Sequence, residues 1–280
     1  MLVATPIGNL GDLSPRARDA LADADLICCE DTRRTRALLS AAGIPAGNRL
    51  LSLHGHNEAQ RLGRVSNCVA AGGTVVVVSD AGTPGISDPG AWLAAQLVEA
   101  GETVTTVPGP SAVIAALGVS GLSTDRFCVE GFLPRKGAER HRRVTALMSD
   151  ERTSVVFEAP GRVAATLAEL AGADPGRSVA VVRELTKIHE EVWRGALRDA
   201  ADKFSAEPPR GEVVLVVGGA PPAAPPDEDE VEAAVRTALA GDPSAGLRQV
   251  ADRVAAALGV PKRRAYEAAL RVRDGVAGMP

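Results

Sequence analysis

The sequence predicts an α/β protein with two α/β domains followed by a small helical module. The first indication is a rhythm in which short apolar runs end in glycine, proline or polar residues and then give way to helical patterns. The second is a stiff Pro108-Gly109-Pro110 connection between two such halves. The third is a proline-rich and acidic stretch, residues 220–230, before the last helical segment. Strands that are each followed by a helix indicate a helix-flanked parallel sheet.

The composition narrows the class of protein. With 280 residues, the chain is long enough to bury roughly three quarters of the surface that its unfolded form exposes. Apolar residues make up 45% and aromatic residues only 2%, so we expect an aliphatic core and no single-strand binding by aromatic stacking. The formal net charge is −4. A nucleic-acid partner would therefore need local basic patches, because there is no global positive field.

The cysteines and the apolar runs indicate a cytoplasmic protein. Cys28, Cys29, Cys68 and Cys128 lack CxxC spacing, which favours buried free thiols over zinc ligands or disulfides. No apolar run approaches the ~20 residues of a membrane span, and no signal peptide opens the sequence. We expect a soluble protein of the reducing cytoplasm that holds no metal and contacts no membrane.

The first half, residues 1–109, contains five runs that read as strands of one sheet. Ser14 is suited to cap the first helix, with Pro15 at its first position. A second helix is expected to begin in the run 30–36, where charges of both signs are packed together. The expected strands are 2–4, 26–29, 50–53, 74–78 and 103–107, and the later helices are 58–71 and 91–99.

The second half, residues 110–219, has longer polar turns between its elements, which suggests a mixed sheet. Ser111 is a plausible cap for its first helix. The expected strands are 127–129, 154–157, 179–182 and 212–217, and the expected helices are 112–117, 138–148, 162–170 and 196–204.

The remainder divides into a linker, 220–230, and a helical module, 231–280. The linker carries four prolines and then Asp227-Glu228-Asp229-Glu230, so we expect a solvated spacer. In the module, a helix ending near Leu258, a Gly-Val-Pro turn and a helix from Lys262 suggest a helix-turn-helix. The module has eight Lys and Arg against five Asp and Glu. Contact with phosphate and a merely solvated basic helix are both open interpretations.

The loop from Ser79 to Gly90, which we call the organising loop, is the stretch on which the functional prediction depends. It follows a run of valines, and its glycines and prolines suit a loop with a fixed shape. Ligands of open α/β sheets bind at the carboxyl ends of the strands, where this loop is expected. Together with residues 5–10 and 108–111, it could line one crevice with backbone N–H and C=O groups, and we call these three segments the motif loops. Such a crevice suits a ligand with amine, carboxylate and hydroxyl groups.

Other ligand classes lack support in the sequence. Neither GxGxxG nor GxxxxGK[ST] occurs, so a dinucleotide or nucleoside-triphosphate site is disfavoured. No GxSxG elbow occurs, and His54 and His56 have no evident Ser or Cys partner, so a nucleophilic hydrolase is also disfavoured.

Eight motifs follow one another along the chain from Leu2 to about Gly218. They are Thr5-Pro6-Ile7-Gly8-Asn9, Cys29-Glu30-Asp31-Thr32-Arg33, His56-Asn57-Glu58, Ser79 to Gly90, Pro108 to Ala112, Gly131 to Lys136, Glu158-Ala159-Pro160, and Arg183 to Lys187 with Glu190-Glu191. In this order they resemble the signatures of one branch of the tetrapyrrole methylase superfamily, the branch that methylates small-subunit ribosomal RNA. The terminal helical module also resembles that branch.

The resemblance implies S-adenosyl-L-methionine as the cofactor, held between two α/β domains. It also implies that the acceptor is the ribose 2′-oxygen of a cytidine, cytidine 1402, in the decoding region of 16S rRNA. Such a transfer depends on positioning, helped by a base or a charge near the hydroxyl. Asp80 is the charged group expected to touch the cofactor. The residues implied at the cofactor are Pro6, Ile7, Gly8, Asp80, Ala81, Gly82, Thr83, Ser111, Ala112, Ala159, Leu185 and Glu212.

On the acceptor side we expect Glu30 or Asp31 as base or ribose anchor, faced by Glu184 and Lys187 of the second domain. Solvated ion pairs at a helix start are the alternative interpretation. A dense basic stretch, 126–143, is expected to follow the rRNA backbone, unless its side chains only cover apolar surface. The residues expected on phosphates are Arg33, Arg34, Arg36, Arg135, Lys136, Arg140, Arg142 and Arg143.

The sequence departs from the branch's pattern at two positions. Gly55 stands where an acidic residue is usual, and Gly161 where a histidine is usual. Two other functions remain open: a corrin or porphyrin precursor methyltransferase of the same fold, and a ligand-sensing helix-turn-helix regulator. The resemblance implies a homodimer that acts on small-subunit rRNA or the 30S subunit.

Overall fold

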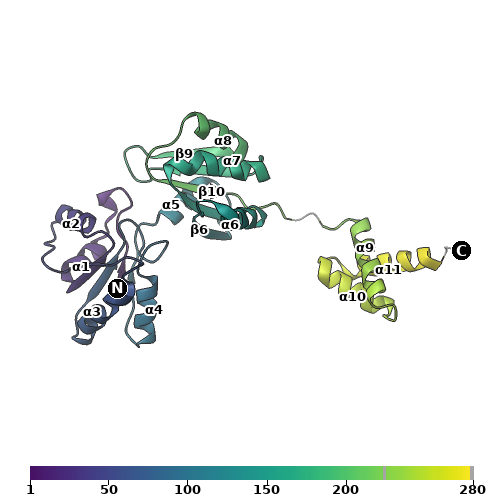
Figure 1. Cartoon of the computed structure of the whole chain (residues 1–280), viewed down its shortest axis with the longest axis horizontal. Helices are drawn as coiled ribbons and strands as arrows, with labels where there is room; N and C mark the ends of the chain where they lie inside the picture. Colours follow the sequence, from purple (N-terminus) through teal and green to yellow (C-terminus); the bar gives the residue numbers. More distant parts are fainter. Residues whose placement is uncertain (223–224, 278–280) are drawn as a thin grey trace. The chain divides into compact units, whose positions relative to one another are not determined.

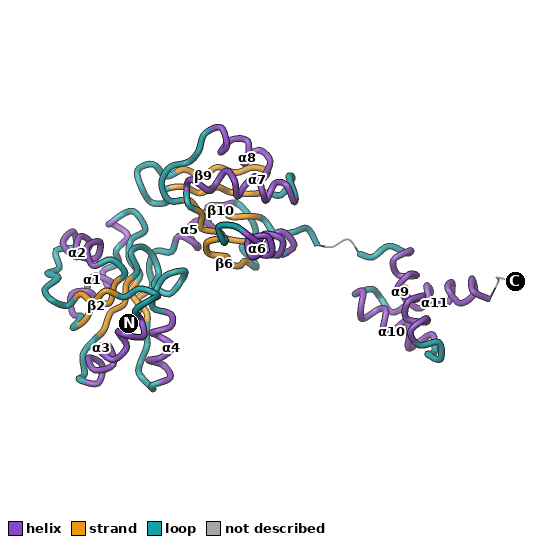
Figure 2. Tube along the Cα trace, viewed as in Figure 1, coloured by secondary structure: helices purple, strands orange, loops and turns teal. Residues whose placement is uncertain are grey.

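The computed structural model describes residues 1–222 and 225–277, and the chain forms two compact units. The first unit is Met1–Ala220 and the second is Pro221–Pro280. Figure 1 labels the elements along the chain, and Figure 2 shows the same trace by secondary structure. No helix in the described ranges is both long and apolar enough to cross a bilayer.

A five-stranded parallel sheet forms the centre of the amino-terminal half of the first unit. Its strand order is β3-β2-β4-β1-β5. The strands are β1 (Leu2–Val3), β2 (Leu26–Cys29), β3 (Leu50–Ser52), β4 (Val75–Val78) and β5 (Thr106–Val107). The helices are α1 (Pro15–Asp23), α2 (Thr32–Ala41), α3 (Glu58–Ala70) and α4 (Ala91–Glu99), with a short 3-10 helix, η1 (Leu10–Asp12).

Both faces of this sheet are buried, which explains the uninterrupted apolar strands. In β4, Val76 and Val78 pack with α1 and α2 residues such as Leu21 and Leu39. Val75 and Val77 pack on the other side with α3 and α4 residues that include Leu93. Parallel strands covered by helices on both faces read as continuous apolar runs, as this sequence does.

Local signals place the starts of the first two helices. The Ser14 hydroxyl accepts a hydrogen bond from Ala17 N, with Pro15 at the first helical position, as expected. Asp31 caps α2 in the same way through Arg33 N. The fifth strand is shorter than expected, since only Thr106 and Val107 pair with β1.

The second sheet is mixed, as the long polar turns suggested. Its order is β6-β7-β10-β8-β9, with β6 and β7 parallel and the other pairs antiparallel. The strands are β6 (Phe127–Phe132), β7 (Thr153–Glu158), β8 (Ser178–Arg183), β9 (Glu191–Ala196) and β10 (Val213–Val217). The helices are α5 (Ala112–Ser120), α6 (Gly137–Ser149), α7 (Val163–Ala173) and α8 (Leu197–Ala206), with a 3-10 turn, η2 (Pro160–Arg162).

The layers of this half follow from which strand residues are buried together. Val156 and Leu215 pack in one cluster with residues of α6, α7 and α8, such as Leu167. Val155 and Val214 face the opposite way, in a cluster with α5. Strand β9 was not expected from the sequence. It is an edge strand of partly polar residues, and only its pairing with β8 defines it.

The second unit is a three-helix module rather than the expected two helices after a linker. Its helices are α9 (Glu228–Gly241), α10 (Leu247–Leu258) and α11 (Lys262–Ala277). The acidic run is not linker as we had predicted, because Asp227 and Glu230 form a reciprocal capping box at the start of α9. Val231 and Val235 of α9 then pack with Val250 and Val254 of α10. The predicted turn between α10 and α11 is present, with Gly259 in the left-handed region.

Candidate functional site

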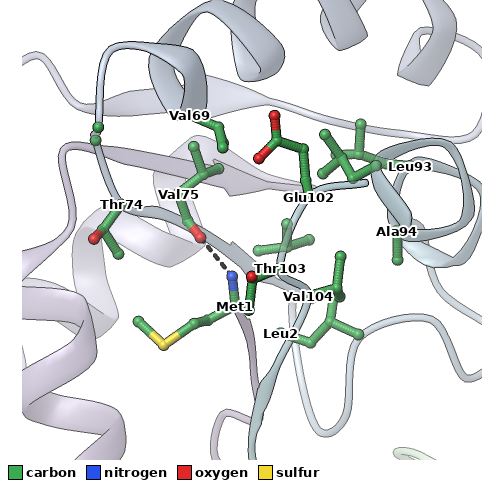
Figure 3. Close-up of a pocket in the computed structure, with 14 residues that line it drawn as sticks. Met1, Leu2, Val69, Thr74, Val75, Leu93, Ala94, Glu102, Thr103 and Val104 are labelled. Carbon is green, nitrogen blue, oxygen red and sulfur yellow. Dashed lines mark hydrogen bonds between the residues drawn. The ribbon is translucent and has the colours of Figure 1, made fainter. Parts of the chain in front are cut away.

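One hollow of about 380 Å³ lies at the edge of the first sheet where the strands begin (Figure 3). Its walls come from the starts of β1 and β4 and from residues 102–104 before β5, with Leu93 of α4. The Met1 amino group donates a hydrogen bond of 2.7 Å to Val75 O there. Since all strands of this sheet are parallel, this edge is opposite the motif loops, so the hollow is not the predicted site.

A second cavity, of about 390 Å³, lies where the motif loops meet the second sheet, and we call it the motif cavity. Eight of the twelve residues expected at the cofactor line it, and they come from both halves of the first unit. They are Ile7, Ala81, Gly82, Thr83, Ser111, Ala112, Ala159 and Glu212. The other four lie elsewhere: Pro6, Gly8 and Asp80 line an adjoining hollow beside α2, and Leu185 is buried in the α5 cluster.

Hydrogen bonds from backbone N–H groups and one side-chain hydroxyl hold the three glycine- and proline-rich loops together as one wall. Thr5 and Gly82 exchange N–H···O bonds of 2.9 and 3.1 Å. The Thr83 hydroxyl donates to Pro110 O at 3.1 Å. A side chain at Gly82 would be strained at φ +82°, and its Cβ would lie 3.3 Å from Ile7 Cγ2. Glycine at this position therefore lets the loops approach each other closely.

Several residues of the cavity wall were not expected from the sequence. Phe132 and Phe157 both line it, with ring centroids 5.6 Å apart, and Ile86 lies in the organising loop. Phe132 is 59% exposed, an unusual position for one of only four phenylalanines in the chain. Its place in the Gly131–Lys136 motif was a usable signal. The other additional lining residues are Ser87, Asp88, Val113, Glu158, Pro160, Gly211, Val213 and Val214.

Asp80 is turned toward the start of α2 and not into the motif cavity. Its Oδ1 accepts a hydrogen bond from Asp31 N at 2.9 Å, and its Oδ2 lies 3.5 Å from a guanidinium nitrogen of Arg34. Asp80 is not among the residues that line the motif cavity, and its contact with the cofactor stays a prediction. The Asp80 carboxylate therefore connects the organising loop to the start of α2 through a hydrogen bond and an ion pair.

The two candidate bases after β2 have different surroundings. Asp31 accepts hydrogen bonds from the Arg33 guanidinium and backbone, and these lower the pKa of its carboxyl far below the ordinary value. Asp31 is thus a helix cap and a poor base, which agrees with the alternative interpretation of an ion pair at a helix start. Burial, followed by repulsion from Asp80, raises the pKa of Glu30. Neither residue lines the motif cavity.

Asp88 is a carboxylate of the motif cavity that the sequence analysis did not single out. Burial, followed by repulsion from Glu30, raises its pKa to about 6, against the effect of a hydrogen bond with the Ser79 hydroxyl. Asp80 contributes a further, smaller repulsion. Within the described residues, no group of His, Cys, Asp or Glu side chains is arranged to hold a metal ion.

Glu184 and Lys187 form an ion-paired cluster beside the cavity instead of a free acid and base. Lys187 Nζ donates to Glu184 Oε1 at 2.8 Å and to Glu212 Oε2 at 3.0 Å. The Lys187 hydrogen bond lowers the pKa of Glu184. Glu184 and Thr186 both have positive φ, at 52° and 63°, and such strain in non-glycine residues is typical of functional loops. A Cβ at Gly8 would clash with Lys187 Cγ, so this loop packs closely over the first motif.

The basic stretch before and along α6 is only partly available to RNA. Arg135, Lys136 and Arg142 are exposed. Arg140 is not, because its guanidinium donates to Glu169, to Pro134 O and to the Thr166 hydroxyl, with the side chain 11% exposed. We therefore withdraw Arg140 as a phosphate contact.

The remaining arginines divide in the same way. Arg143 pairs with Glu130 at 2.6 Å, and the Arg143 side chain is partly exposed. On α2, Arg33, Arg34 and Arg36 are exposed, with Arg33 paired to Asp31. These arginines keep a surface from which phosphates can be reached.

The two departures from the motif pattern are not imposed by packing. A Cβ at Gly55 or at Gly161 would meet nothing within 4 Å, and neither residue has positive φ. Neither position therefore requires glycine, since a Cβ would fit at both.

Comparison with protein families finds a match to the tetrapyrrole (corrin/porphyrin) methylases over residues 1–201. A ribosomal RNA small subunit methyltransferase I of Mycobacterium tuberculosis is 46% identical, covering 99% of this chain and 96% of the relative. The protein of the same name from Synechocystis is 43% identical, covering 98% of each chain.

Solved structures show the same fold at lower identity. The methyltransferase CobJ superposes with a TM-score of 0.57 at 23% identity, covering 78% of this chain and 93% of its own. Uroporphyrin-III C-methyltransferase from Thermus thermophilus, complexed with S-adenosylhomocysteine, gives 0.52 at 18% identity, covering 77% and 90%.

Proposed function

Because this chain belongs to the tetrapyrrole methylase family, and within it to the ribosomal RNA small subunit methyltransferase I group, we propose a specific acceptor for it. The protein is an S-adenosylmethionine-dependent rRNA methyltransferase. The acceptor proposed is the ribose 2′-oxygen of a cytidine, cytidine 1402, in the decoding region of 16S rRNA.

The observation that supports this proposal best is the chemistry of the motif cavity. Its charged lining residues are Asp88, Glu158 and Glu212, all acidic, and the rest of its wall is backbone, small residues and apolar side chains. A negative, largely apolar cavity suits a ligand with a sulfonium, an ammonium and a planar adenine. A phosphate-bearing ligand would meet repulsion there. The cavity is also large enough for a ligand of this size.

The residues of the chain divide the work between the two substrates. Backbone groups at Ala81 and Thr83 can orient the amino-acid part of the cofactor, while Phe132 and Phe157 provide an apolar wall. When bound, the cofactor supplies an electrophilic methyl group that needs no metal. The protein must then hold a ribose hydroxyl in line with that methyl, which is a problem of orientation.

The exposed basic side chains support an RNA acceptor over a tetrapyrrole. Arg33, Arg34 and Arg36 on α2 flank one side of the motif loops, and Arg135 and Lys136 follow β6, whose last residue, Phe132, lines the cavity. Phosphates held by these side chains would place a nucleotide at the cavity mouth. We further propose that the enzyme is cytoplasmic and homodimeric, as the family resemblance implied, with rRNA or the 30S subunit as its partner.

Methyl transfer to defined acceptors tests the proposal. Tritiated S-adenosylmethionine would be incubated with the protein and either 30S subunits, naked 16S rRNA or a porphyrin precursor. We expect label in the 30S sample, at one cytidine whose 3′ phosphodiester resists alkaline cleavage because its 2′-oxygen is methylated. Label on a base, or label only in the porphyrin sample, would contradict the proposed acceptor. Binding of the cofactor without any transfer would instead favour a ligand-sensing regulator.

A further inference from the structure

The second unit has an open hollow of about 430 Å³ with walls from α10 and α11, and we call it the module hollow. Three of its six lining residues are cations and one is an anion. They are Arg248, Ala251 and Asp252 of α10, and Lys262, Arg263 and Tyr266 of α11. The match to the methylase family covers residues 1–201, so the fold of the catalytic unit does not account for this surface.

The cations of the module hollow stand where helix stability disfavours them. Arg248 lies in the first turn of α10, and Lys262 and Arg263 open α11. The amino-terminal end of a helix carries the positive end of the dipole, so cations there are unfavourable. Helix α9 of the same module follows the usual preference, with three acidic residues in its first turn. Residues that break a local rule at two helix starts indicate a surface kept for a negatively charged partner.

The positive charge of the hollow is only partly neutralised within the module. Lys262 Nζ lies 2.8 Å from Asp252 Oδ1. Arg263 Nε lies 2.9 Å from Glu267 Oε1. The two cationic side chains remain 77% and 88% exposed, so these ion pairs are weak and can be exchanged for another anion. Within the part of the chain that the structure describes, the exposed Arg248 guanidinium has no hydrogen-bond or ion-pair partner.

The arrangement of the two helices suits the backbone of a nucleic acid. In a helix-turn-helix, residues at the start of the second helix face the nucleic acid. Lys262 and Arg263 hold those places in α11, and Tyr266, the only tyrosine of the chain, follows one turn later and is 37% exposed. Ammonium, guanidinium and tyrosine hydroxyl groups all donate hydrogen bonds to phosphate oxygens. Because the hollow is open and its cations are exposed, a polyanion fits it better than a small enclosed ligand.

We propose that the module hollow binds backbone phosphates of the substrate rRNA, as a second RNA site besides the motif cavity. RNA is the polyanion on which this enzyme acts. The proline-rich stretch 221–226 is suited to a semi-rigid tether. A weak site on a tethered module raises the overall affinity for a shared ligand without any new contact in the first unit. The inference goes beyond the proposed acceptor, because it holds whichever rRNA nucleotide is methylated.

The test removes two cations of the hollow from the full chain, as Arg248→Ala with Arg263→Ala. Losing two phosphate contacts should reduce the slope of log affinity against log salt by roughly 1.4 to 1.8, for 30S subunits and for naked 16S rRNA alike. At 100 mM KCl, filter binding should be weaker by roughly 10- to 50-fold. The matched control is Arg236→Ala with Arg253→Ala, two exposed arginines of the same module that do not line the hollow. The control should keep the wild-type slope.

Kinetics and unfolding separate this role from a structural one. The 30S concentration that gives half-maximal methylation should rise by the same factor as the dissociation constant, while the single-turnover rate at saturating 30S is kept. Since alanine replaces unfavourable cations at helix starts, the variant should resist urea at least as well as the wild type.

Three outcomes would overturn the proposal. The first is an unchanged salt slope in the Arg248 and Arg263 variant, and the second is an equal loss in the control. The third is a loss seen with 30S subunits and not with naked 16S rRNA, because the hollow would then contact a ribosomal protein. Failure of the wild-type protein to methylate 30S subunits would instead reject the proposed function, while the salt dependence of RNA binding would still report on the hollow.

Discussion

The carboxylate of Glu58 accepts a hydrogen bond from the backbone N–H of Leu93 at 3.0 Å, across 35 residues of sequence. Helix α4 begins after Gly90, which has no side chain to cap it, and Glu58 from α3 supplies the missing acceptor. A negative charge at this end also interacts favourably with the helix dipole. Since α4 starts where the organising loop ends, this contact fixes one end of the motif cavity wall.

Replacing Glu58 with glutamine should therefore destabilise the protein and weaken cofactor binding. A neutral amide keeps an acceptor but loses the charge that strengthens both hydrogen bonds. We expect a loss of about 1–2 kcal/mol in the free energy of unfolding, measured by urea denaturation. Glu99→Gln, at the exposed end of α4, should change the free energy of unfolding by less than about 0.5 kcal/mol. Equal effects of the two substitutions would contradict the role assigned to Glu58.

Truncating Phe132 should reduce affinity for the cofactor without affecting the fold. Its ring lines the cavity beside Phe157, while Phe127 on the same strand does not line it. We expect Phe132→Ala to weaken S-adenosylhomocysteine binding roughly 3- to 10-fold by calorimetry, the size of one aromatic contact. Phe127→Ala is the control and should bind normally. If Phe127→Ala had the larger effect, the cofactor would not lie against Phe132.

The double substitution Arg135→Ala with Lys136→Ala should weaken 30S binding mainly at low salt. Both side chains are exposed in the turn after β6. Each phosphate contact contributes about 0.7 to 0.9 to the slope of log affinity against log salt, so losing two contacts should reduce the slope by roughly 1.4 to 1.8. Filter binding from 50 to 300 mM KCl would measure it. An unchanged slope would remove this turn from the RNA surface.

Arg140 should behave in the opposite way to its neighbour Arg142, although both are basic residues of α6. Arg140→Ala would leave Glu169 unpaired and Pro134 O without one of its donors. We expect it to cost about 1–3 kcal/mol of stability, with an unchanged salt slope for RNA binding. Arg142→Ala should leave the unfolding free energy almost unaltered. Thermal or urea unfolding of the two variants would compare them directly.

Asp88 should make the folded protein less stable as the pH rises. Its folded pKa of about 6 lies above the ordinary 3.8, so the folded state binds this proton more tightly than the unfolded state does. The stabilising contribution is therefore present below pH 4 and is lost as the pH rises through 6. Asp88→Asn should be more stable than wild type at pH 8 and equally stable near pH 3.5. The difference at pH 8 should be only about 1 kcal/mol, because water screens the partly exposed carboxylate. Urea denaturation at both pH values would show whether the difference has this sign.

The alternation of strands and helices was predictable because its causes are local. Apolar runs of valine and leucine, a serine cap before Pro15, and loops of glycine and proline act over a few residues. The convergence of three motif loops on one cavity also followed, because parallel strands bring their carboxyl ends to the same edge. The identity of eight cavity residues could therefore be expected from sequence and resemblance.

Contacts between distant segments were decided only by the tertiary structure. Nothing near Asp80 in the sequence indicates that it would meet Asp31 N, and nothing near Arg140 points to Glu169. The edge strand β9 likewise exists through its pairing with β8.

The sequence by itself determined the fold class, the family and the loops that build the cavity. The tertiary structure decided which acidic side chain enters that cavity and which arginines stay free for phosphate. Chain direction and hydrogen bonding set local structure, while the pairing and desolvation of a charge depend on neighbours that only folding brings together.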